Sequence, residues 1–566
     1  MMDLKGKPFY LQNEDIQWVK NTLESMDLDA KVGQLFCPLG MNDDQTELQD
    51  MLENYQPGGI MYRPGEGVGV QSTHRYLQEN SRIPLLVSAN LEAGGNGIAS
   101  EGTYFGKQMQ VAATDNEEMG YRLGQIAGRE GKAVGCNWAF APVVDIDMNF
   151  RNPITNIRTY GSDPERVLRM GKAYVKGVQE NGVAASIKHF PGDGVDDRDQ
   201  HLHISINSLS VEDWDQTYGM VYKGLIDEGA MTVMIGHIML PAYSRALSPD
   251  IRDEELMPAT LSPELLNGLL RDKLGFNGMI VTDAATMAGF TMAMKREIAV
   301  PKSIAAGCDM FLFNRNMPED YKYMKEGIEN GILTMKRVDE AVTRILALKA
   351  SLGLHRKQQE DKLVPGLDAL SVMKCEEHEK WAQECADQAI TLVKDTQSLL
   401  PISPERHKRI LFFSLGDEVG HYSSEVSYRT LVEQLEREGF VVDIFNRENL
   451  DFSWMMTSIK SLTDKYDLAI YCANIVTMSN QTVVRINWAP PMGADMPWFL
   501  QELPTLFIST ASPYHLQDVP QVKTFINTYS SSEYVYEALV EKLLGRSPFK
   551  GVNPVDPFCT YWETKL

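Results

Sequence analysis

The stretch that decides the fold is the apolar run Ala184-Ala185-Ser186-Ile187-Lys188-His189-Phe190, followed by the loop Pro191-Gly192-Asp193-Gly194-Val195-Asp196-Asp197-Arg198-Asp199-Gln200-His201. The apolar run predicts a buried strand, and the proline and glycines after it predict an irregular loop. Within the loop, Asp199 stands two residues before His201. An aspartate that orients an imidazole lets a histidine act as an acid/base catalyst near neutral pH. The stretch therefore predicts a strand that leads into a loop with chemistry.

Seven further apolar runs, most of them separated by stretches of helical length, surround this strand in residues 1–354. Eight strands that alternate with helices are typical of a (β/α)8 TIM-like barrel, in which catalytic groups lie at the C-terminal ends of the strands. Lys188 and His189 end the fifth run, His237 the sixth and Asp283 the seventh, so we expect these side chains to converge on one mouth. The predicted strands are 33–38, 58–62, 84–90, 137–143, 184–190, 232–238, 278–283 and 309–313.

Residues 355–375 are charged and contain Pro365 and Gly366, which predicts a linker. In residues 376–566 we expect one helix near 376–394 and another over 425–438. Apolar runs alternate with such helical stretches, which predicts a smaller three-layer α/β domain with a mostly parallel sheet. No glycine-rich phosphate loop occurs there, so a nucleotide role has no support. The predicted strands of this domain are 410–415, 440–445, 467–473, 505–510 and 524–528.

The composition describes a soluble globular protein, with 43% hydrophobic and 23% charged residues in a chain of 566. Its net charge of −23 argues against nucleic acid or an anionic membrane as a partner, because either would repel the protein. The seven cysteines lack the spacing of a disulfide framework or a zinc site. The N-terminus has no apolar signal segment and no run approaches 18 apolar residues, so we expect a cytoplasmic protein. The sequence indicates no cofactor and no metal, and it leaves the oligomeric state open.

Two motifs in the barrel region are specific enough to compare with known families. Lys188 to His201 matches K-H-[FI]-P-G-[HD]-G-x4-D-x-H without insertion or deletion, and Gly275 to Asp283 matches G-F-x-G-hydrophobic-[ST]-D. These motifs resemble the β-N-acetylglucosaminidase branch of glycoside hydrolase family 3. The predicted two-domain architecture, which spans nearly the whole chain, is also similar to that family.

The resemblance implies a retaining, exo-acting β-N-acetylhexosaminidase that removes a terminal N-acetylhexosamine from a small-molecule or oligosaccharide substrate. Retention requires a nucleophile on one face of the sugar and a proton donor on the other. Asp283 would attack the anomeric carbon and form a covalent glycosyl-enzyme. His201 would protonate the leaving oxygen and then activate water, while Asp199 would hold the tautomer of the imidazole.

Four basic residues match family positions associated with the substrate: Lys188, His189, Arg158 and His237. Arg158, in Asn156-Ile157-Arg158-Thr159-Tyr160-Gly161, has a second interpretation as an ion-pair partner of Asp145 or Asp147. Both roles can hold together. For His237 the alternative is a core residue whose hydrogen bonds are satisfied inside the protein.

The third predicted strand departs from the family pattern. The family has D-x-E-G-G there, followed by an arginine, whereas this chain reads Asn90-Leu91-Glu92-Ala93-Gly94-Gly95-Asn96. Asn90 replaces the aspartate that grips the far side of the sugar, and the arginine is missing. An amide lacks the charge that strengthens a hydrogen bond to a hydroxyl. Preference between gluco and galacto sugars therefore stays open, and a β-N-acetylgalactosaminidase is an alternative.

Four other functions remain as alternatives. A β-glucosidase of the same family takes its acid/base from the second domain and lacks the D-x-H pair. A metal-dependent barrel hydrolase would use Asp199, His201 and His203 as ligands. A sugar-binding protein without catalysis would fit the changes around Asn90, but binding alone needs neither Asp283 nor His201. A phosphorylase is the fourth, because a histidine acid is neutral after donating its proton and so tolerates phosphate as the acceptor.

Overall fold

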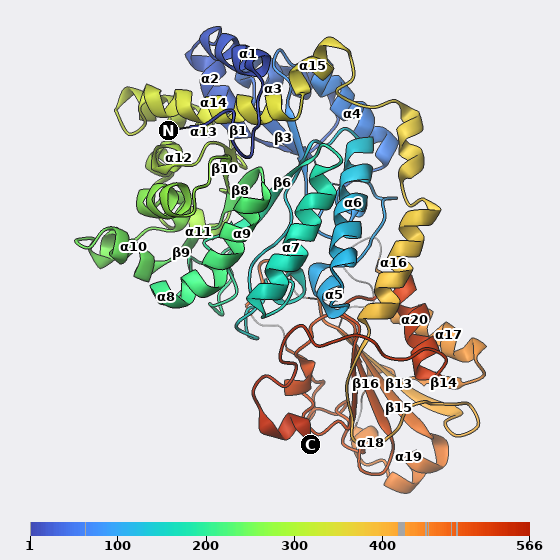
Figure 1. The fold of residues 1–566 in the computed structure, drawn as a ribbon. Coiled ribbons are helices and arrows are strands. Elements are labelled where there is room, and N and C mark those ends of the chain that lie inside the picture. Colours follow the sequence, from blue (N-terminus) through green and yellow to red (C-terminus); the bar gives the residue numbers. More distant parts are fainter. Residues whose placement is uncertain are drawn as a thin grey trace.

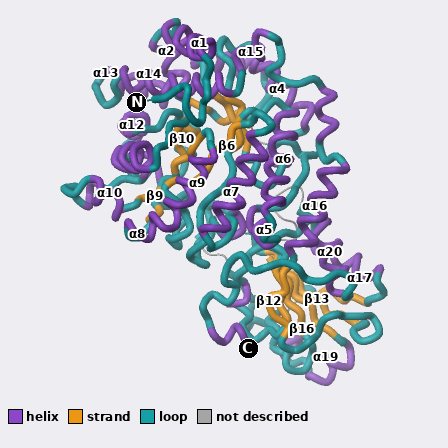
Figure 2. The backbone as a smooth tube through the Cα atoms, viewed as in Figure 1, coloured by secondary structure: helices purple, strands orange, loops and turns teal. Residues whose placement is uncertain are grey.

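The computed structural model describes residues 2–62, 64–416, 425–447, 450, 452–476, 478–482 and 485–566. The blue-to-yellow part of the chain in Figure 1 forms a helix-covered barrel, and the orange-to-red part forms a second domain. In Figure 2 the strands accordingly gather in two separate groups. The protein thus has two domains in the order that the sequence predicts.

Eight parallel strands form the first domain. They are β1 (Phe36–Cys37), β3 (Gly59–Tyr62), β4 (Leu86–Ala89), β5 (Trp138–Ala139), β6 (Ala184–Phe190), β8 (Thr232–Ile235), β10 (Met279–Thr282) and β11 (Phe311–Leu312). One sheet has the order β10-β8-β6-β5-β4-β3 and then the short β2 (Leu39–Gly40), while β1 pairs with β11. Backbone hydrogen bonds from Gly58 to Phe36 (3.0 Å) and from Thr282 to Met310 (3.1 Å) connect this pair to both ends of the sheet. The strands therefore close into a barrel.

The predicted (β/α)8 barrel is confirmed, because each of the eight predicted runs contains one of the barrel strands, in the predicted order. Several strands are shorter than their runs. The run 137–143, for example, is a strand only at Trp138–Ala139. Pro142 lies in the rest of that run and has no N–H to donate to a sheet ladder, which shortens the strand.

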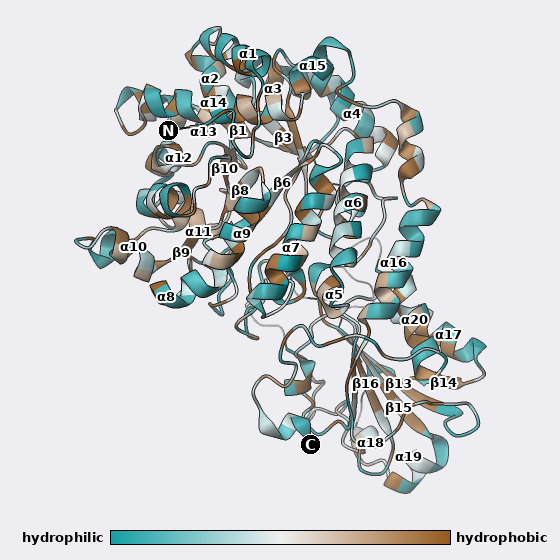
Figure 3. Cartoon of the chain, in the orientation of Figure 1, coloured by the Kyte–Doolittle hydropathy of each residue, from teal (hydrophilic) through white to brown (hydrophobic). Residues whose placement is uncertain are grey.

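Helices cover the outside of the barrel. Along the chain they include α1 (Asn13–Glu24), α2 (Leu28–Gln34), α3 (Gln45–Tyr55), α4 (Gly67–Glu79), α6 (Glu117–Ala133), α7 (Pro164–Gln179), α9 (Met220–Glu228), η6 (Glu264–Lys273), α12 (Arg296–Ala306), α13 (Met317–Glu329) and α14 (Met335–Ser351). The start of α7 is typical: Asp163 caps it by accepting the N–H of Glu165, and Pro164 takes the first position, where no hydrogen bond is lost. Figure 3 shows these helices as largely hydrophilic with hydrophobic bands, as expected for one face packed on the strands.

The second domain contains one six-stranded sheet. Its strands are β12 (Thr391–Asp395), β13 (Arg409–Gly416), β14 (Val441–Ile444), β15 (Leu468–Asn474), β16 (Thr505–Ser509) and β17 (Thr524–Asn527), in the order β12-β17-β16-β15-β13-β14. All neighbours are parallel except β12 and β17. One hydrophobic core joins the sheet to α16 (Glu376–Ala389), α17 (Tyr428–Arg437) and α20 (Glu533–Leu543), and another joins it to α19 (Ile459–Lys465). The predicted three-layer α/β domain is confirmed.

The start of this domain differs from the sequence prediction. The helix expected near 376–394 ends at Ala389, and residues 391–395 form β12. The physical reason is the sequence Ile390-Thr391-Leu392-Val393, because β-branched side chains favour a strand, and β17 offers an edge that it joins antiparallel. The residues predicted as a linker, 355–375, contain helical structure. The helix α15 (Leu354–Gln359) overlaps their start, and the short helix η7 (Leu367–Val372) lies within them.

The two domains touch across a partly apolar interface. Helix α16 packs against α5 (Gln108–Ala113) and α6 of the barrel, and Figure 1 shows it running along these helices. The Tyr514 hydroxyl donates a 2.7 Å hydrogen bond to Oδ2 of Asp147 in the barrel. Burial raises the pKa of Asp147 to about 7. None of the helices in the described ranges is long and apolar enough to cross a membrane.

Candidate active site

The predicted side chains converge at the C-terminal ends of the strands. Lys188 and His189 lie near the C-terminal end of strand β6, and Asp283 directly follows β10. Nε2 of His189 lies 3.9 Å from Oδ2 of Asp283. His201 and His237 also interact electrostatically with Asp283. The sequence therefore predicted correctly that groups far apart along the chain share one mouth.

Asp283 is held as a carboxylate in this mouth. Its side chain is 14% exposed, and Oδ1 accepts the N–H of Ala284 at 2.7 Å. Burial by itself raises the pKa of this carboxyl, but electrostatic interactions with nearby histidines, His189 first, bring the pKa below its ordinary value of 3.8. An ionised, partly exposed carboxylate at a strand end is what nucleophilic attack requires.

Asp199 and His201 form a hydrogen-bonded pair. Oδ1 of Asp199 lies 2.6 Å from Nδ1 of His201 and accepts the backbone N–H of the same histidine at 2.8 Å. The Asp199 side chain is fully buried, whereas that of His201 is 26% exposed. Although burial raises the pKa of Asp199, the interactions with His201 hold it below its ordinary value. A carboxylate bound at Nδ1 leaves Nε2 as the nitrogen that exchanges a proton with a substrate.

The loop that carries this pair is packed tightly onto the barrel. Gly192 and Gly194 have φ values of +117° and +106°, and an added Cβ would lie 2.1 Å from the Tyr218 ring and 2.0 Å from the carbonyl oxygen of Ile146, respectively. Trp214 donates its indole N–H to Pro191 O at 2.9 Å. Only glycine combines this backbone conformation with these contacts, which explains the two glycines of the motif.

His189 is oriented by an aspartate from the segment that follows the neighbouring strand β5. Asp145 lies 2.7 Å from Nδ1 of His189 through Oδ2, and its Oδ1 accepts the backbone N–H groups of His189 and Asp193. Nε2 of His189 is therefore the nitrogen on the side of Asp283. From sequence alone, Asp145 was expected only as a possible ion-pair partner of Arg158.

Lys188 and Arg158 share one carboxylate, that of Glu92. Its Oε1 lies 2.7 Å from Nζ of Lys188 and 2.9 Å from an Arg158 nitrogen, and Oε2 accepts a second Arg158 hydrogen bond at 3.1 Å. Burial raises the pKa of Glu92, but the two cations hold it well below its ordinary value. Glu92 thus occupies the place expected for Asp145 or Asp147 as the partner of Arg158. The sequence feature that could have pointed to Glu92 is its match to the glutamate of the D-x-E-G-G motif after the third predicted strand.

His237 is fully buried beside Asp283. Its Nδ1 lies 2.9 Å from the Thr260 hydroxyl and its Nε2 lies 3.0 Å from the carbonyl oxygen of Ala284. Burial lowers the pKa of His237, which favours the neutral ring. These bonds fix the backbone next to Asp283, and a contact of His237 with the sugar stays a prediction.

Asn90 follows β4 and is exposed at the same end of the barrel. The chain folds back closely beyond it, since an added Cβ on Gly97 would lie 1.9 Å from the Asn90 carbonyl oxygen. Because Asn90 is exposed, its amide side chain is accessible to a ligand, and its contact with the sugar stays a prediction.

The alternative of a metal site at Asp199, His201 and His203 has little geometric support. In the part of the chain that the structure describes, no group of three or more His, Cys, Asp or Glu side chains is arranged to hold a metal ion. Asp199 instead accepts N–H donors, and His203 is exposed.

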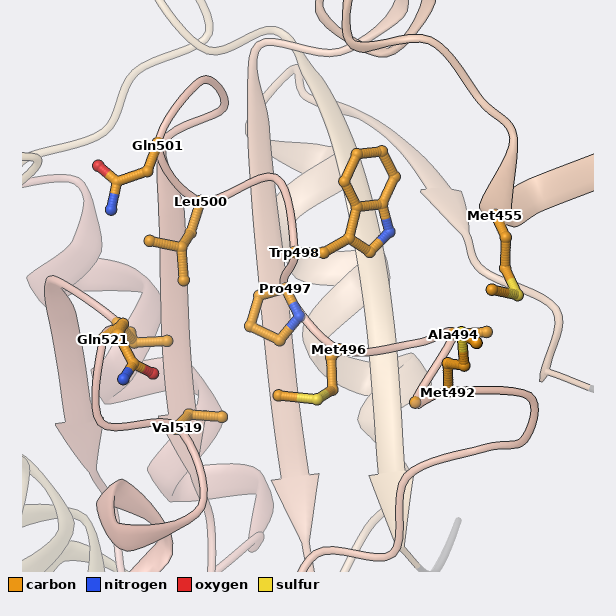
Figure 4. Close-up of a pocket in the computed structure, with 12 residues that line it drawn as sticks. Met455, Met492, Ala494, Met496, Pro497, Trp498, Leu500, Gln501, Val519 and Gln521 are labelled. Carbon is orange, nitrogen blue, oxygen red and sulfur yellow. The ribbon is translucent and has the colours of Figure 1, made fainter.

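A well-formed apolar cavity of about 470 Å³ lies in the second domain, away from these residues. It is lined by Met455, Met492, Gly493, Ala494, Met496, Pro497, Trp498, Leu500, Gln501, Val519, Gln521 and Val522 (Figure 4). None of these side chains is titratable or nucleophilic, so the cavity supplies no acid, base or nucleophile. The candidate chemistry belongs to the barrel mouth.

A parallel (β/α)8 barrel with acidic and basic side chains gathered at its C-terminal strand ends defines a barrel enzyme. Residues 27–348 match the model of the glycosyl hydrolase family 3 N-terminal domain. The chain therefore belongs to glycoside hydrolase family 3, and the family inferred from the two sequence motifs is confirmed.

Three relatives show how far the similarity extends. A β-N-acetylglucosaminidase/β-glucosidase of Cellulomonas fimi is 48% identical, and the match covers 100% of both chains. The solved structure of the β-glucoside phosphorylase BglX is 46% identical, with a TM-score of 0.94 over 99% of each chain. The structure of a family 3 β-N-acetylglucosaminidase from Paenibacillus sp. str. FPU-7 is 24% identical, with a TM-score of 0.79 over 95% of this chain and 100% of that one. This last similarity concerns the fold.

Proposed function

We propose that the protein is a retaining, exo-acting β-N-acetylhexosaminidase of the β-N-acetylglucosaminidase type. The observation that carries the proposal is the presence of the Asp283 carboxylate and the Asp199–His201 pair at one barrel mouth. The C. fimi relative, whose name includes β-N-acetylglucosaminidase, supports the substrate class.

In the first step, a carboxylate oxygen of Asp283 attacks the anomeric carbon while the bond from that carbon to the leaving oxygen breaks. The proton on Nε2 of His201 moves to the leaving oxygen, so the alcohol departs neutral. Asp199 stabilises the imidazolium before this transfer and keeps Nδ1 protonated after it. The sugar is left as an ester of Asp283.

In the second step, the neutral Nε2 of His201 takes a proton from water. The resulting hydroxyl attacks the anomeric carbon from the face that the alcohol left, and the bond to Asp283 breaks. Two inversions give net retention. Lys188, His189 and Arg158 would contact the sugar hydroxyls, and their contacts with Glu92 and Asp145, which hold their side chains in position, support this role.

A second candidate is a phosphorylase that acts on β-glucosides. After proton donation His201 is neutral, so it does not repel a phosphate anion as a carboxylate would. Phosphate oxygen would then attack the anomeric carbon in place of water and release a sugar 1-phosphate. The 46% identity to the β-glucoside phosphorylase BglX favours this alternative.

A panel of nitrophenyl glycosides, assayed with and without phosphate, tests the proposal. We expect turnover of the β-N-acetylglucosaminide with retention and without a requirement for phosphate. Rate acceleration by phosphate together with accumulation of sugar 1-phosphate would establish the second candidate. Turnover of glucoside alone, or loss of activity with a chelator, would contradict the proposed substrate class or mechanism.

Asn90→Asp should increase selectivity for the gluco over the galacto sugar. Restoring a carboxylate at the exposed strand end adds a charge-assisted hydrogen bond, worth about 1.5–3 kcal/mol or roughly 10- to 100-fold in kcat/KM. The measurement is kcat/KM for N-acetylglucosaminide and N-acetylgalactosaminide in both proteins. An unchanged ratio would show that Asn90 does not face the sugar.

A further inference from the structure

The second domain reaches the acid/base pair of the barrel directly. The backbone N–H of Asn480 donates a 2.7 Å hydrogen bond to Oδ2 of Asp199. Asn480 lies beyond the end of β15, in the short described segment 478–482. This contact joins residues 281 positions apart and lies at the centre of the proposed chemistry.

With the hydrogen bond from Asn480, both oxygens of the Asp199 carboxylate accept hydrogen bonds. Oδ1 accepts both N–H groups of His201, and Oδ2 accepts the N–H of Asn480. With donors on both oxygens, rotation of the buried carboxylate about its Cβ–Cγ bond is restricted. The Nδ1 partner of His201 therefore stays in place, and with it the direction of Nε2.

The backbone of Asn480 is in the left-handed region, with φ of +71°. Asparagine and glycine tolerate this conformation, whereas proline cannot adopt it. The side chain of Asn480 is exposed, and its Nδ2 donates to the Ser479 hydroxyl at 3.3 Å. The contribution to Asp199 thus comes from the main chain.

A second contact from the same domain supports the base of the catalytic loop, residues 191–201, which carries Asp199 and His201. Tyr514 donates to Asp147, whose other oxygen accepts the Thr155 hydroxyl at 3.1 Å. Asp147 follows Ile146, the residue against which Gly194 of the loop packs. The second domain therefore touches the catalytic loop at Asp199 and, at Asp147, the segment after β5 on which the loop rests.

We propose that Asn480 is a positioning residue for catalysis, and that its main-chain N–H orients the Asp199–His201 pair from the second domain. The inference rests on the proposed role of this pair as acid/base. The second domain would then contribute to catalysis, because the hydrogen-bond donor to Oδ2 of Asp199 comes from that domain and not from the barrel. Asn480 acts through Asp199 and does not touch the reacting atoms.

The test compares Asn480→Pro with Asn480→Gly in the full-length protein. Proline removes the N–H and excludes positive φ, whereas glycine keeps the N–H and the conformation. Both variants, and His201→Ala, are assayed with aryl glycosides whose leaving groups range from activated to poor. Thermal unfolding confirms that each variant is folded.

For Asn480→Pro we expect kcat/KM to fall about 10- to 100-fold on poor leaving groups and much less on activated ones, because only poor leaving groups need the proton. Asn480→Gly should retain most of the activity that the proline variant loses. The inference is overturned if both variants behave alike, or if proline lowers activity equally across the series, as a general structural defect would. If His201→Ala itself shows no leaving-group dependence, the result contradicts the proposed acid/base role of His201, independently of the results for the Asn480 variants.

Discussion

Asp283→Asn should lower kcat by about three orders of magnitude or more, because the amide cannot form the covalent glycosyl-enzyme. The variant should fold normally, since an amide oxygen can still accept the N–H of Ala284 that Oδ1 of Asp283 now accepts.

The low pKa of Asp283 also predicts that, as pH falls, the wild type loses nucleophilic carboxylate only below the ordinary aspartate pKa of 3.8. Steady-state kinetics and a pH profile provide the measurements.

The matched control is Asp197→Asn, an exposed carboxylate in the catalytic loop. Its removal should change kcat little, which separates the effect of Asp283 from a general loss of negative charge. A 2-fluoro sugar should label the wild type and this control at Asp283, as detected by the mass of the digested protein. A label on another residue would contradict the assignment.

The fold and much of the site follow from the sequence because their signals are local. A buried strand needs a run of apolar residues, and each of the eight barrel strands has one. The places of the candidate site residues Lys188, His189 and Asp283 follow from the barrel rule, because these residues end such runs. The beginning of the second domain was misjudged at β12 because a short apolar run after a helix fits either structure until a neighbouring strand is known.

Asp199 could be predicted as the partner of His201 because the two are close in sequence, but the partners that orient Lys188 and His189 could not, because they depend on contacts between distant segments. Glu92 lies in the segment after β4 and Lys188 lies in β6, and only the folded barrel brings the glutamate to 2.7 Å from the lysine. The Asn480 contact is harder still, since a backbone N–H carries no side-chain signature and its partner lies in another domain. Sequence patterns thus identify the groups suited to the chemistry, while tertiary structure determines how those groups are held.

His201→Ala should lower kcat/KM by about 10²- to 10⁴-fold on substrates with poor leaving groups, the usual contribution of general acid catalysis. On activated nitrophenyl substrates the first step should change little, because a nitrophenolate departs without a proton. The His201 side chain is 26% exposed, which leaves it accessible to substrate, whereas that of Asp199 is fully buried. Replacing His201 by alanine should therefore disturb the packing of the protein little. A leaving-group series in kcat/KM measures the effect.

Asp199→Asn provides a companion to this variant, because it keeps the shape of the side chain but removes the charge that stabilises the imidazolium. Its loss should follow the same leaving-group trend as His201→Ala, and the double variant should be little worse than His201→Ala alone, since the aspartate acts through the histidine. Asp197→Asn should show no such trend. Equal losses across the series for His201→Ala would indicate a binding or structural role for His201. Additive losses in the double variant would show that Asp199 and His201 act independently, contrary to their 2.6 Å hydrogen bond.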